Sequence, residues 1–339
     1  MTSFPLSVLD LAPVGRGATP ADALAASLRL AQATERLGYH RFWVAEHHNM
    51  PGIASSSPAV LLAHLGAGTS TIRLGSGGVM LPNHSSLVVA EQFGMLEALH
   101  PGRIDLGLGR APGTDGITAV ALRRSRDISG EDFPRQVAEL LAYFHDDWPA
   151  EHPFAKIHAV PARGYQPALW LLGSSDFGAV MAGQMGLPYS FAHHFAGDNT
   201  MSAVAAYRAN FRPSGVLERP YLMLGVNVLC APTDDEADYL AGSGRLAILR
   251  LRQGRPDLYP TPEEAAEYSF TPMEKEVVRG WTANHVVGAP ATVRAGLEDL
   301  VARTGADELM LTTMAHDPAS RIRSFELVAE EMALQPSDA

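Results

Sequence analysis

Residues 45–53 read AEHHNMPGI, so a carboxylate and two adjacent imidazoles, Glu46, His47 and His48, stand where an apolar run ends and a Pro-Gly turn begins. Such side chains can hold a metal ion or move protons. Successive strand residues point to opposite faces, and the chain lacks an HExxH spacing, so we predict no metal here. One histidine could transfer protons or orient a cofactor, although a histidine bonded only to backbone fits the same pattern.

Two other segments could bind phosphate. GSSDFG at 173–178 opens a helical stretch, where the backbone N–H groups around Gly178 and the hydroxyls of Ser174 and Ser175 can reach an anion. Arg110, at the end of another apolar run, supplies a guanidinium suited to phosphate. A helix cap and a surface ion pair are the simpler interpretations. Asp176 would weaken phosphate binding unless it turns away or caps the helix.

A glycine pair interrupts a further apolar run, GSGGVM at 75–80. Glycine inside a strand indicates a bulge or a flat molecule lying close to the backbone, so Gly77, Gly78 and the following Val79 are candidate cofactor positions. GLGRAPG at 107–113 lacks the GxGxxG spacing that opens a helix, which argues against a dinucleotide-binding fold.

These motifs follow strand-like runs that alternate with segments of helical spacing. The runs are Phe4–Leu11, Arg41–Glu46, Ile72–Leu81, Arg103–Gly109, Ala168–Gly173, Tyr189–Ala192, Tyr221–Ala231 and Glu308–Thr313. Eight parallel strands that are apolar throughout fit a closed (β/α)8 barrel better than a doubly wound sheet, the alternative that the pattern leaves open. Ligands of such a barrel bind at the carboxyl ends of the strands, where the candidate residues gather.

Two segments depart from the repeat. Residues 146–166 and 254–288 are rich in proline, and we expect irregular insertions that act as lids, binding loops or partner surfaces. The composition suggests no boundary between domains, so we predict one domain over residues 1–339.

Composition restricts the function. The net charge of −11 and the pI near 5.6 argue against nucleic acid or an anionic membrane as a partner. The one cysteine, Cys230, excludes a disulfide within the chain and a cysteine-rich metal site. No basic-then-apolar leader and no membrane-length apolar stretch is seen, so we expect a cytoplasmic protein.

FWVAEHHNMPG, followed by IRLGSGGVMLPNHSSLVVAEQFGMLEALHPGRIDLGLGRAPGTD, resembles the bacterial luciferase-like, flavin-dependent monooxygenase family. The similarity is closest to its single-chain members and extends from SVLDLAPV through GQMGLPYSFAHHF. It implies a TIM barrel with reduced FMN, or less well a deazaflavin, on the C-terminal rim. It also implies that His47 is the catalytic residue beside the flavin and that Gly77–Gly78 is a non-prolyl cis peptide. The implied cofactor-binding residues are Glu46, Gly77, Gly78, Val79, Arg110, Ser174, Ser175 and Gly178.

The resemblance implies that reduced FMN, supplied by a separate NAD(P)H-dependent reductase, reacts with O2 to a flavin C4a-peroxide that oxygenates a small organic substrate. It further implies a homodimer formed through the first helices. The apolar face of the helix at Ser86–Leu99 could contribute to this contact, although core packing explains the same residues. A deazaflavin-dependent hydride transfer and a non-catalytic flavin-binding protein are the alternatives. Gly109 stands where the light-emitting subunit has a reactive cysteine, so a role for that thiol does not carry over.

Overall fold

The computed structural model describes residues 4–123 and 130–335 and contains a closed parallel barrel. The barrel strands are β1 (Leu6–Asp10), β2 (Arg41–Val44), β3 (Arg73–Met80), β4 (Ile104–Gly109), β5 (Ala168–Gly173), β6 (Tyr189–Phe191), β7 (Leu222–Cys230) and β9 (Glu308–Thr312). They pair in the order β6-β5-β4-β3-β2-β1-β9-β7, and β6 also pairs with β7, which closes the sheet. The predicted (β/α)8 barrel is confirmed, and the doubly wound alternative is wrong.

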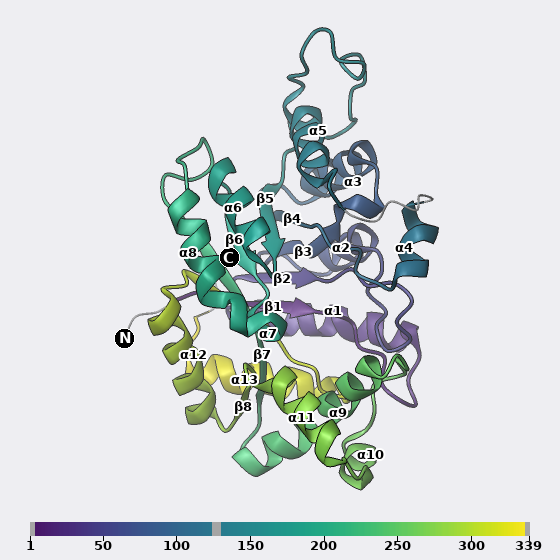
Figure 1. Ribbon diagram of the computed structural model, residues 1–339, viewed down its shortest axis with the longest axis vertical. Coiled ribbons are helices and arrows are strands. Elements are labelled where there is room, and N and C mark those ends of the chain that lie inside the picture. The colour runs from purple at the N-terminus through teal and green to yellow at the C-terminus, as the bar shows by residue number, and fades with distance from the viewer. Residues whose placement is uncertain (1–3, 124–129, 336–339) are drawn as a thin grey trace.

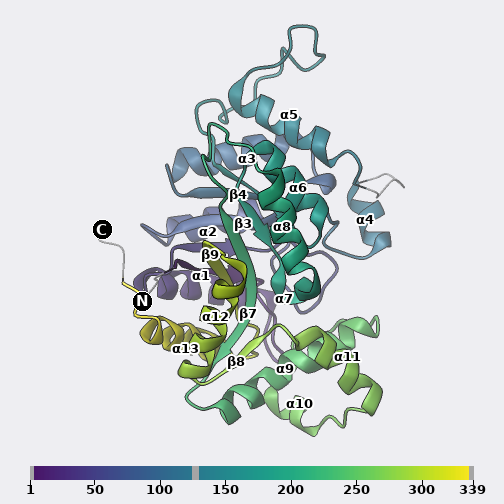
Figure 2. The same ribbon diagram turned by 60° about the vertical axis from the view of Figure 1, so that its left-hand side comes forward.

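Helices surround this barrel (Figure 1). They are α1 (Pro20–Arg36), α2 (Pro58–Ala67), α3 (Ser86–Leu99), α4 (Gly116–Arg123), α5 (Phe133–His145), α6 (Asp176–Met185), α7 (His193–Ala196), α8 (Thr200–Asn210), α9 (Asp234–Arg252), α10 (Pro262–Glu267), α11 (Pro272–Thr282), α12 (Pro290–Thr304) and α13 (Pro318–Glu331), with 3-10 turns η1 (Leu81–Asn83) and η2 (Gly197–Asn199). The two ribbon views place α9, α10 and α11 at one end of the molecule and α5 at the other (Figure 2).

The two proposed insertions differ in structure. Residues 146–166 contain only turns and bends, as expected, and extend beyond α5 at the top of Figure 1. The expectation of an irregular segment at 254–288 is wrong, because it contains α10, α11 and the short strand β8 (Val286–Gly288). β8 pairs with the carboxyl end of β7 outside the closed barrel, so it adds no ninth barrel strand.

Two layers of apolar side chains hold the barrel together. The larger layer fills the space between the strands and the helices, and the smaller one lies inside the barrel. In the inner layer, Trp43 of β2 and Trp170 of β5 meet edge to face with ring centroids 5.3 Å apart. Each fully buried large apolar side chain stabilises the fold by about 1.5–3 kcal/mol. The barrel interior at this level is therefore a packed core and not a channel.

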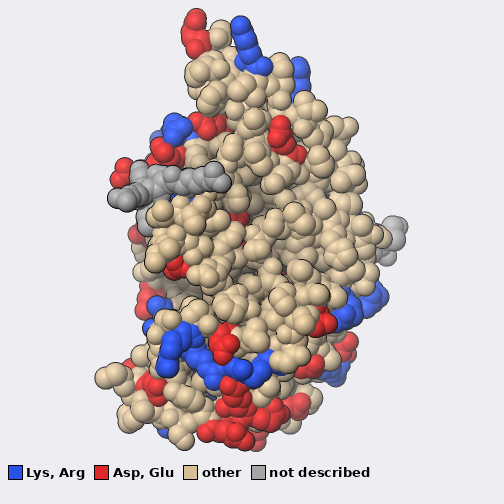
Figure 3. All heavy atoms as spheres, turned by 90° about the vertical axis from the view of Figure 1, so that its right-hand side faces the viewer, with Lys and Arg blue, Asp and Glu red and all other residues tan. Residues whose placement is uncertain are grey.

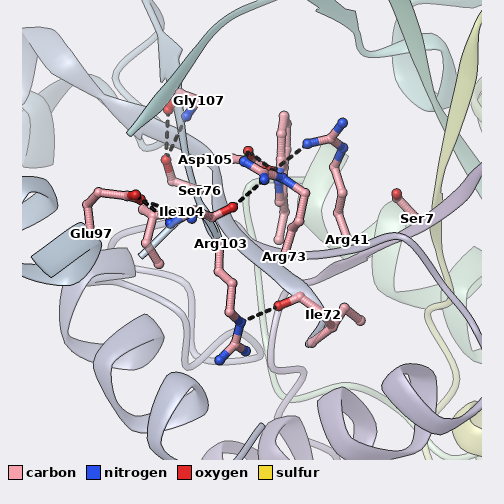
Figure 4. Close-up of polar contacts among 12 residues, drawn as sticks. Ser7, Arg41, Ile72, Arg73, Ser76, Glu97, Arg103, Ile104, Asp105 and Gly107 are labelled. Carbon is pink, nitrogen blue, oxygen red and sulfur yellow. Dashed lines mark hydrogen bonds and ion pairs between the residues drawn. The ribbon is translucent and has the colours of Figure 1, made fainter. Parts of the chain in front are cut away.

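Buried ion pairs fill the end of the barrel where the strands begin (Figure 4). Arg41 at the start of β2 contacts Asp105 of β4 at 2.9 Å and Glu308 of β9 at 3.0 Å, while Arg73 contacts Asp105 at 2.6 Å. Asp105 also accepts a hydrogen bond from the Trp43 indole at 3.0 Å. Because the charges at this end are paired with one another, the ligand site is expected at the opposite rim.

Candidate functional site

Glu46 follows β2 and is fully buried, although it is ionised. Its Oε1 accepts hydrogen bonds from Nε2 of His48 and Nε2 of His84, both at 2.9 Å, and its Oε2 accepts the Met80 N–H at 3.0 Å. Burial alone would raise the pKa of the Glu46 carboxyl, but these hydrogen bonds outweigh burial and hold it below its usual value. The ring of His48 is therefore bonded to a carboxylate and not to the backbone.

His47 is held in a different way. The backbone N–H of His47 donates to the Ser55 carbonyl oxygen at 3.0 Å, and its ring atom Nδ1 lies 3.3 Å from the Gly113 carbonyl oxygen. Since a carbonyl oxygen only accepts, Nδ1 carries the proton of the neutral ring and leaves Nε2 with a free lone pair. Burial lowers the pKa of His47, so the ring is neutral at pH 7 and Nε2 can accept a proton.

A cavity of about 1250 Å³ lies at the carboxyl ends of the strands. His47 and His48 line it from the β2 side, and α9 and the end of α11 line it from the other side. Phe195 of α7 and Trp281 of α11 stack at its edge, with ring centroids 6.1 Å apart and planes 12° from parallel. The space-filling view shows the rim as mostly uncharged around a hollow, with charged side chains gathered at its lower end (Figure 3).

The predicted phosphate-binding residues come together on another part of the rim. The Arg110 guanidinium carbon lies 4.1 Å from the ring centroid of Phe177, in the first turn of α6. Ser175 is the N-cap residue of α6, but its side chain makes no capping hydrogen bond. Asp176 accepts hydrogen bonds from the Ser202 hydroxyl of α8 at 2.9 and 2.8 Å, which turns its charge toward α8. The Asp176 carboxylate thus turns away, which was one of the two conditions under which it would not weaken phosphate binding.

The glycine pair of β3 has the implied geometry. The Gly77–Gly78 peptide is cis, and the β3–β4 register shifts between Ser76 and Val79, which confirms the predicted bulge. A Cβ on Gly78 would lie 2.8 Å from the Gly107 carbonyl oxygen, so a side chain does not fit there. Val79 packs its side chain in the outer core, which leaves only its backbone for a ligand.

The candidate residues thus fall into two groups. His47 and His48 line the large cavity. The remaining predicted residues are outside the lining of that cavity: Glu46, Gly77, Gly78, Val79, Arg110, Ser174, Ser175 and Gly178. Glu46 reaches the cavity through His48, to which it is hydrogen-bonded. A ligand that used both groups would have to extend across the rim from β2 to α6.

Sequence reasoning missed four residues of the site, namely His84, His194, Trp281 and His285. His84 lies 38 positions from Glu46, so no local pattern links them. His194 stands just after the strand-like run Tyr189–Ala192, and His285 and Trp281 lie in the segment expected to be irregular. Burial lowers the pKa of both His194 and His285 to about 4, so both are neutral at pH 7.

Two features are absent from the described residues, 4–123 and 130–335. No group of three or more His, Cys, Asp or Glu side chains there is arranged to hold a metal ion. Within the same residues, no helix combines the length and apolar character needed to cross a membrane.

The fold and the rim define a (β/α)8-barrel protein with a ligand cavity at the carboxyl ends of its strands. The family model for luciferase-like monooxygenases matches residues 4–308, and the chain belongs to this family. This membership identifies it as an oxidoreductase of the monooxygenase type.

Several relatives match the chain along nearly its whole length. An uncharacterized Bacillus subtilis protein, YvbT, is 50% identical, with 96% of each chain covered. A luciferase-like monooxygenase of Escherichia coli K12 is 46% identical, with 96% of each chain covered. An N-acetyl-S-alkylcysteine monooxygenase of Bacillus subtilis is 35% identical over 96% of this chain and 97% of its own.

Solved structures agree on the fold. Apo-MsnO8 superimposes with a TM-score of 0.90 at 41% identity, covering 98% of this chain and 99% of its own. An FMN complex of the oxygenating constituent of 3,6-diketocamphane monooxygenase from Pseudomonas putida has a TM-score of 0.72 at 18% identity, covering 100% and 99%. An F420-dependent secondary alcohol dehydrogenase has a TM-score of 0.71 at 15% identity, covering 98% and 99%. The last two show the fold alone.

Proposed function

We propose that the protein uses reduced FMN and O2 to insert one oxygen atom into a small organic substrate. The observation that carries this proposal is the arrangement of the rim. A neutral His47 faces a cavity of about 1250 Å³, while Arg110 lies beside the first turn of α6. The first feature suits proton handling next to a bound ring, and the second suits a phosphate.

The residues on the rim fit FMN. Arg110 has no carboxylate partner among the described residues, and the first turn of α6 has backbone N–H groups without helical partners. The FMN phosphate would be held by Arg110, by Ser174 and Ser175 and by the backbone at Gly178. The Gly77–Gly78 backbone, which carries no side chain, would lie against the flavin ring, with the backbone of Val79 next to it. Glu46 would support this segment through its hydrogen bond from the Met80 N–H.

The overall reaction is substrate + O2 + FMNH2 → oxygenated substrate + FMN + water. Bound reduced flavin supplies the two electrons that activate O2. His47 accepts or returns a proton at Nε2, which is free because Nδ1 is directed at the Gly113 carbonyl. Glu46, which is itself hydrogen-bonded to His84, fixes the ring of His48 on the adjacent cavity wall. The Phe195–Trp281 stack adds an apolar wall at the edge of the cavity.

Reduced FMN would come from a separate NAD(P)H-dependent reductase, because the chain lacks a dinucleotide-binding glycine motif. The similarity to an N-acetyl-S-alkylcysteine monooxygenase makes thioethers the first substrates to screen. We place this enzyme in the cytoplasm, as a single domain.

A homodimer is proposed from one apolar surface. The α2–α3 face, defined by Val60, Val88, Met95 and Leu99, has side chains that are 69, 44, 51 and 62% exposed. The three α3 residues recur at intervals of seven and four, so they share one face of the helix. A second copy of the chain would cover this face.

Anaerobic titration tests the choice of cofactor. We expect reduced FMN to bind more tightly than reduced F420, and Arg110→Ala to weaken FMN binding about tenfold or more. Arg303→Ala, which changes an exposed arginine on α12, is the control and should bind FMN normally. Preferred binding of F420, with substrate turnover under argon, would replace this proposal by hydride transfer. FMN binding without any effect on flavin oxidation or any product would indicate a non-catalytic flavin-binding protein.

A further inference from the structure

We propose that the cavity selects its substrate by charge, accepting apolar molecules that are neutral or cationic and disfavouring carboxylates and other anions. This inference rests on the proposed function, since it concerns the organic substrate of the same site. The charged groups that line the cavity, and the partners that neutralise some of them, support the proposal.

Positive charge in the cavity is scarce. Among the described residues that line it, Arg245 of α9 is the only lysine or arginine. Its Nη2 is paired with the carboxylate of Asp238, two turns earlier on the same face of α9, and its Nη1 donates to the Asp238 carbonyl oxygen at 3.3 Å. An incoming carboxylate would have to compete with Asp238 for this guanidinium.

The histidines that line the cavity do not supply the missing positive charge. Burial lowers the pKa of His47, and it lowers the pKa values of His194 and His285 to about 4. All three rings are therefore neutral at pH 7. His48 also lines the cavity, but its Nε2 is already bonded to the buried carboxylate of Glu46 and is not available to an incoming anion.

Negative charge is in excess. The described lining contains Asp115, Asp234, Asp235, Asp238 and Asp257. Two of these are ion-paired, Asp238 with Arg245 and Asp257 with Arg16 at 2.7 Å, which leaves three of the five carboxylates without a cation.

Two of the three remaining carboxylates are stabilised in their charged form by hydrogen bonds from uncharged groups. Asp115 accepts hydrogen bonds from Asn49 and Thr118, both uncharged, and these bonds hold the pKa of its carboxyl well below its usual value. Asp234 accepts the Ala289 N–H at 2.7 Å, which likewise lowers the pKa of its carboxyl. Asp235 makes no hydrogen bond or ion pair with any described residue. An anion entering the cavity would meet net repulsion, and a cation net attraction.

The rest of the cavity wall is apolar. Leu229, Ile248, Met314, Phe195 and Trp281 all line it. Burial against these side chains favours a substrate with a hydrocarbon or aromatic body. The combination of apolar walls with uncompensated carboxylates fits an apolar molecule that is neutral or carries an amine.

Three matched benzyl thioethers test the charge preference. S-benzylcysteamine is cationic, N-acetyl-S-benzylcysteamine is neutral and N-acetyl-S-benzylcysteine is anionic at pH 7. Calorimetric titration of the full chain should show the cation and the neutral compound binding at least about tenfold more tightly than the anion. The advantage of the cation should shrink at high salt. Equal or tighter binding of the anion, or binding of none of the three, would overturn the proposal.

Two variants locate the effect. Asp238→Asn releases Arg245 and should raise the affinity for the anion about tenfold, while Asp235→Asn should reduce the advantage of the cation. Asp299→Asn is the matched control, because Asp299 pairs with Arg303 on α12 outside the cavity; it should change nothing. If Asp238→Asn and Asp235→Asn both left the ratio of cation to anion affinity unchanged, charge selection by these residues would be disproved.

The titration separates this inference from the proposed function. Binding of the thioethers is measured without flavin, O2 or turnover, so a failure to use FMN would leave the charge preference intact. Conversely, an active FMN-dependent enzyme that bound the anion best would refute only the charge preference.

Discussion

His47 and His48 are adjacent in the sequence, but their rings have different partners and so different chemical roles. His47 is anchored to a backbone carbonyl and keeps a free Nε2, whereas His48 is bonded to an ionised carboxylate. The strand has already ended at Val44, so the two rings can face one cavity although successive strand residues cannot.

Replacing His47 tests its role directly. His47→Asn should reduce oxygenation about 10²–10⁴-fold, because it removes the proton acceptor, while the affinity for reduced FMN stays within about threefold. Product formation under saturating flavin is the measurement. His64→Asn, an exposed residue of α2, is the control. Normal turnover in His47→Asn would remove this histidine from the mechanism.

Glu46 is predicted to stabilise the fold as well as to position its neighbours. Glu46→Gln cannot satisfy the same three donors, and leaving buried groups unpaired should lower the free energy of unfolding by about 2–4 kcal/mol. Urea denaturation measures this change. Glu298→Gln, which alters a half-exposed surface pair with Arg294, should change stability by no more than about 0.5 kcal/mol. Equal stability of the two variants would contradict the importance of the Glu46 contacts.

At the scale of elements, close contact between β3 and β4 requires glycine. Gly78→Ala should destabilise the protein by about 1–3 kcal/mol and weaken FMN binding, because the added Cβ would lie 2.8 Å from the Gly107 carbonyl oxygen. Gly280→Ala on α11 is the control, since its Cβ would meet no atom within 4 Å. Thermal denaturation and flavin titration are the measurements, and a stable, flavin-binding Gly78→Ala would show that β3 can shift.

The sequence predicted the barrel strands well because parallel strands buried on both faces form continuous apolar runs. It failed at 254–288, where prolines were taken as signs of irregular chain. Pro262 and Pro272 each stand at the first position of a helix, directly after the N-cap residues Thr261 and Thr271. Thr271 also forms a capping box with Glu274. The sequence therefore did contain a helix-start signal, and a proline at the first helical position is part of that signal.

The site was predicted only where its residues follow strands. His47 and Arg110 were found because each stands just past an apolar run. His84 and Trp281 were not, because their partners are distant in sequence and become neighbours only when the barrel closes and α11 packs beside α7. The pairing of Arg245 with Asp238 likewise needed the structure, since helical spacing of seven residues fits many surface charges.

At the scale of the whole molecule, stability should decline in weak acid. Above the ordinary histidine pKa of 6.5, His194 and His285 are neutral in both the folded and unfolded chain. Between pH 6.5 and about 4, only the unfolded chain takes up these protons, so the free energy of unfolding falls, by roughly 1–3 kcal/mol for each ring. Urea titrations across this range should show less decline in His285→Gln. A decline that is the same in His285→Gln would contradict a contribution from this ring.

The α2–α3 face should determine the oligomeric state. Met95→Glu places a charge in the centre of the proposed dimer contact and should convert the dimer to a monomer, as measured by sedimentation velocity. Met273→Glu on α11, at a position that is 79% exposed, should stay dimeric. A wild-type monomer, or a dimer that tolerates Met95→Glu, would contradict this interface.

Oxidation of bound reduced flavin tests the central claim most directly. Protein loaded anaerobically with reduced FMN is mixed with oxygenated buffer, and the flavin absorbance is followed by stopped flow for wild type and His47→Asn. We predict a transient spectral species that outlasts anything seen with free FMN and is shortened or absent in the variant. Oxidation of the bound flavin with the time course of free FMN in both proteins would contradict the proposed oxygen chemistry.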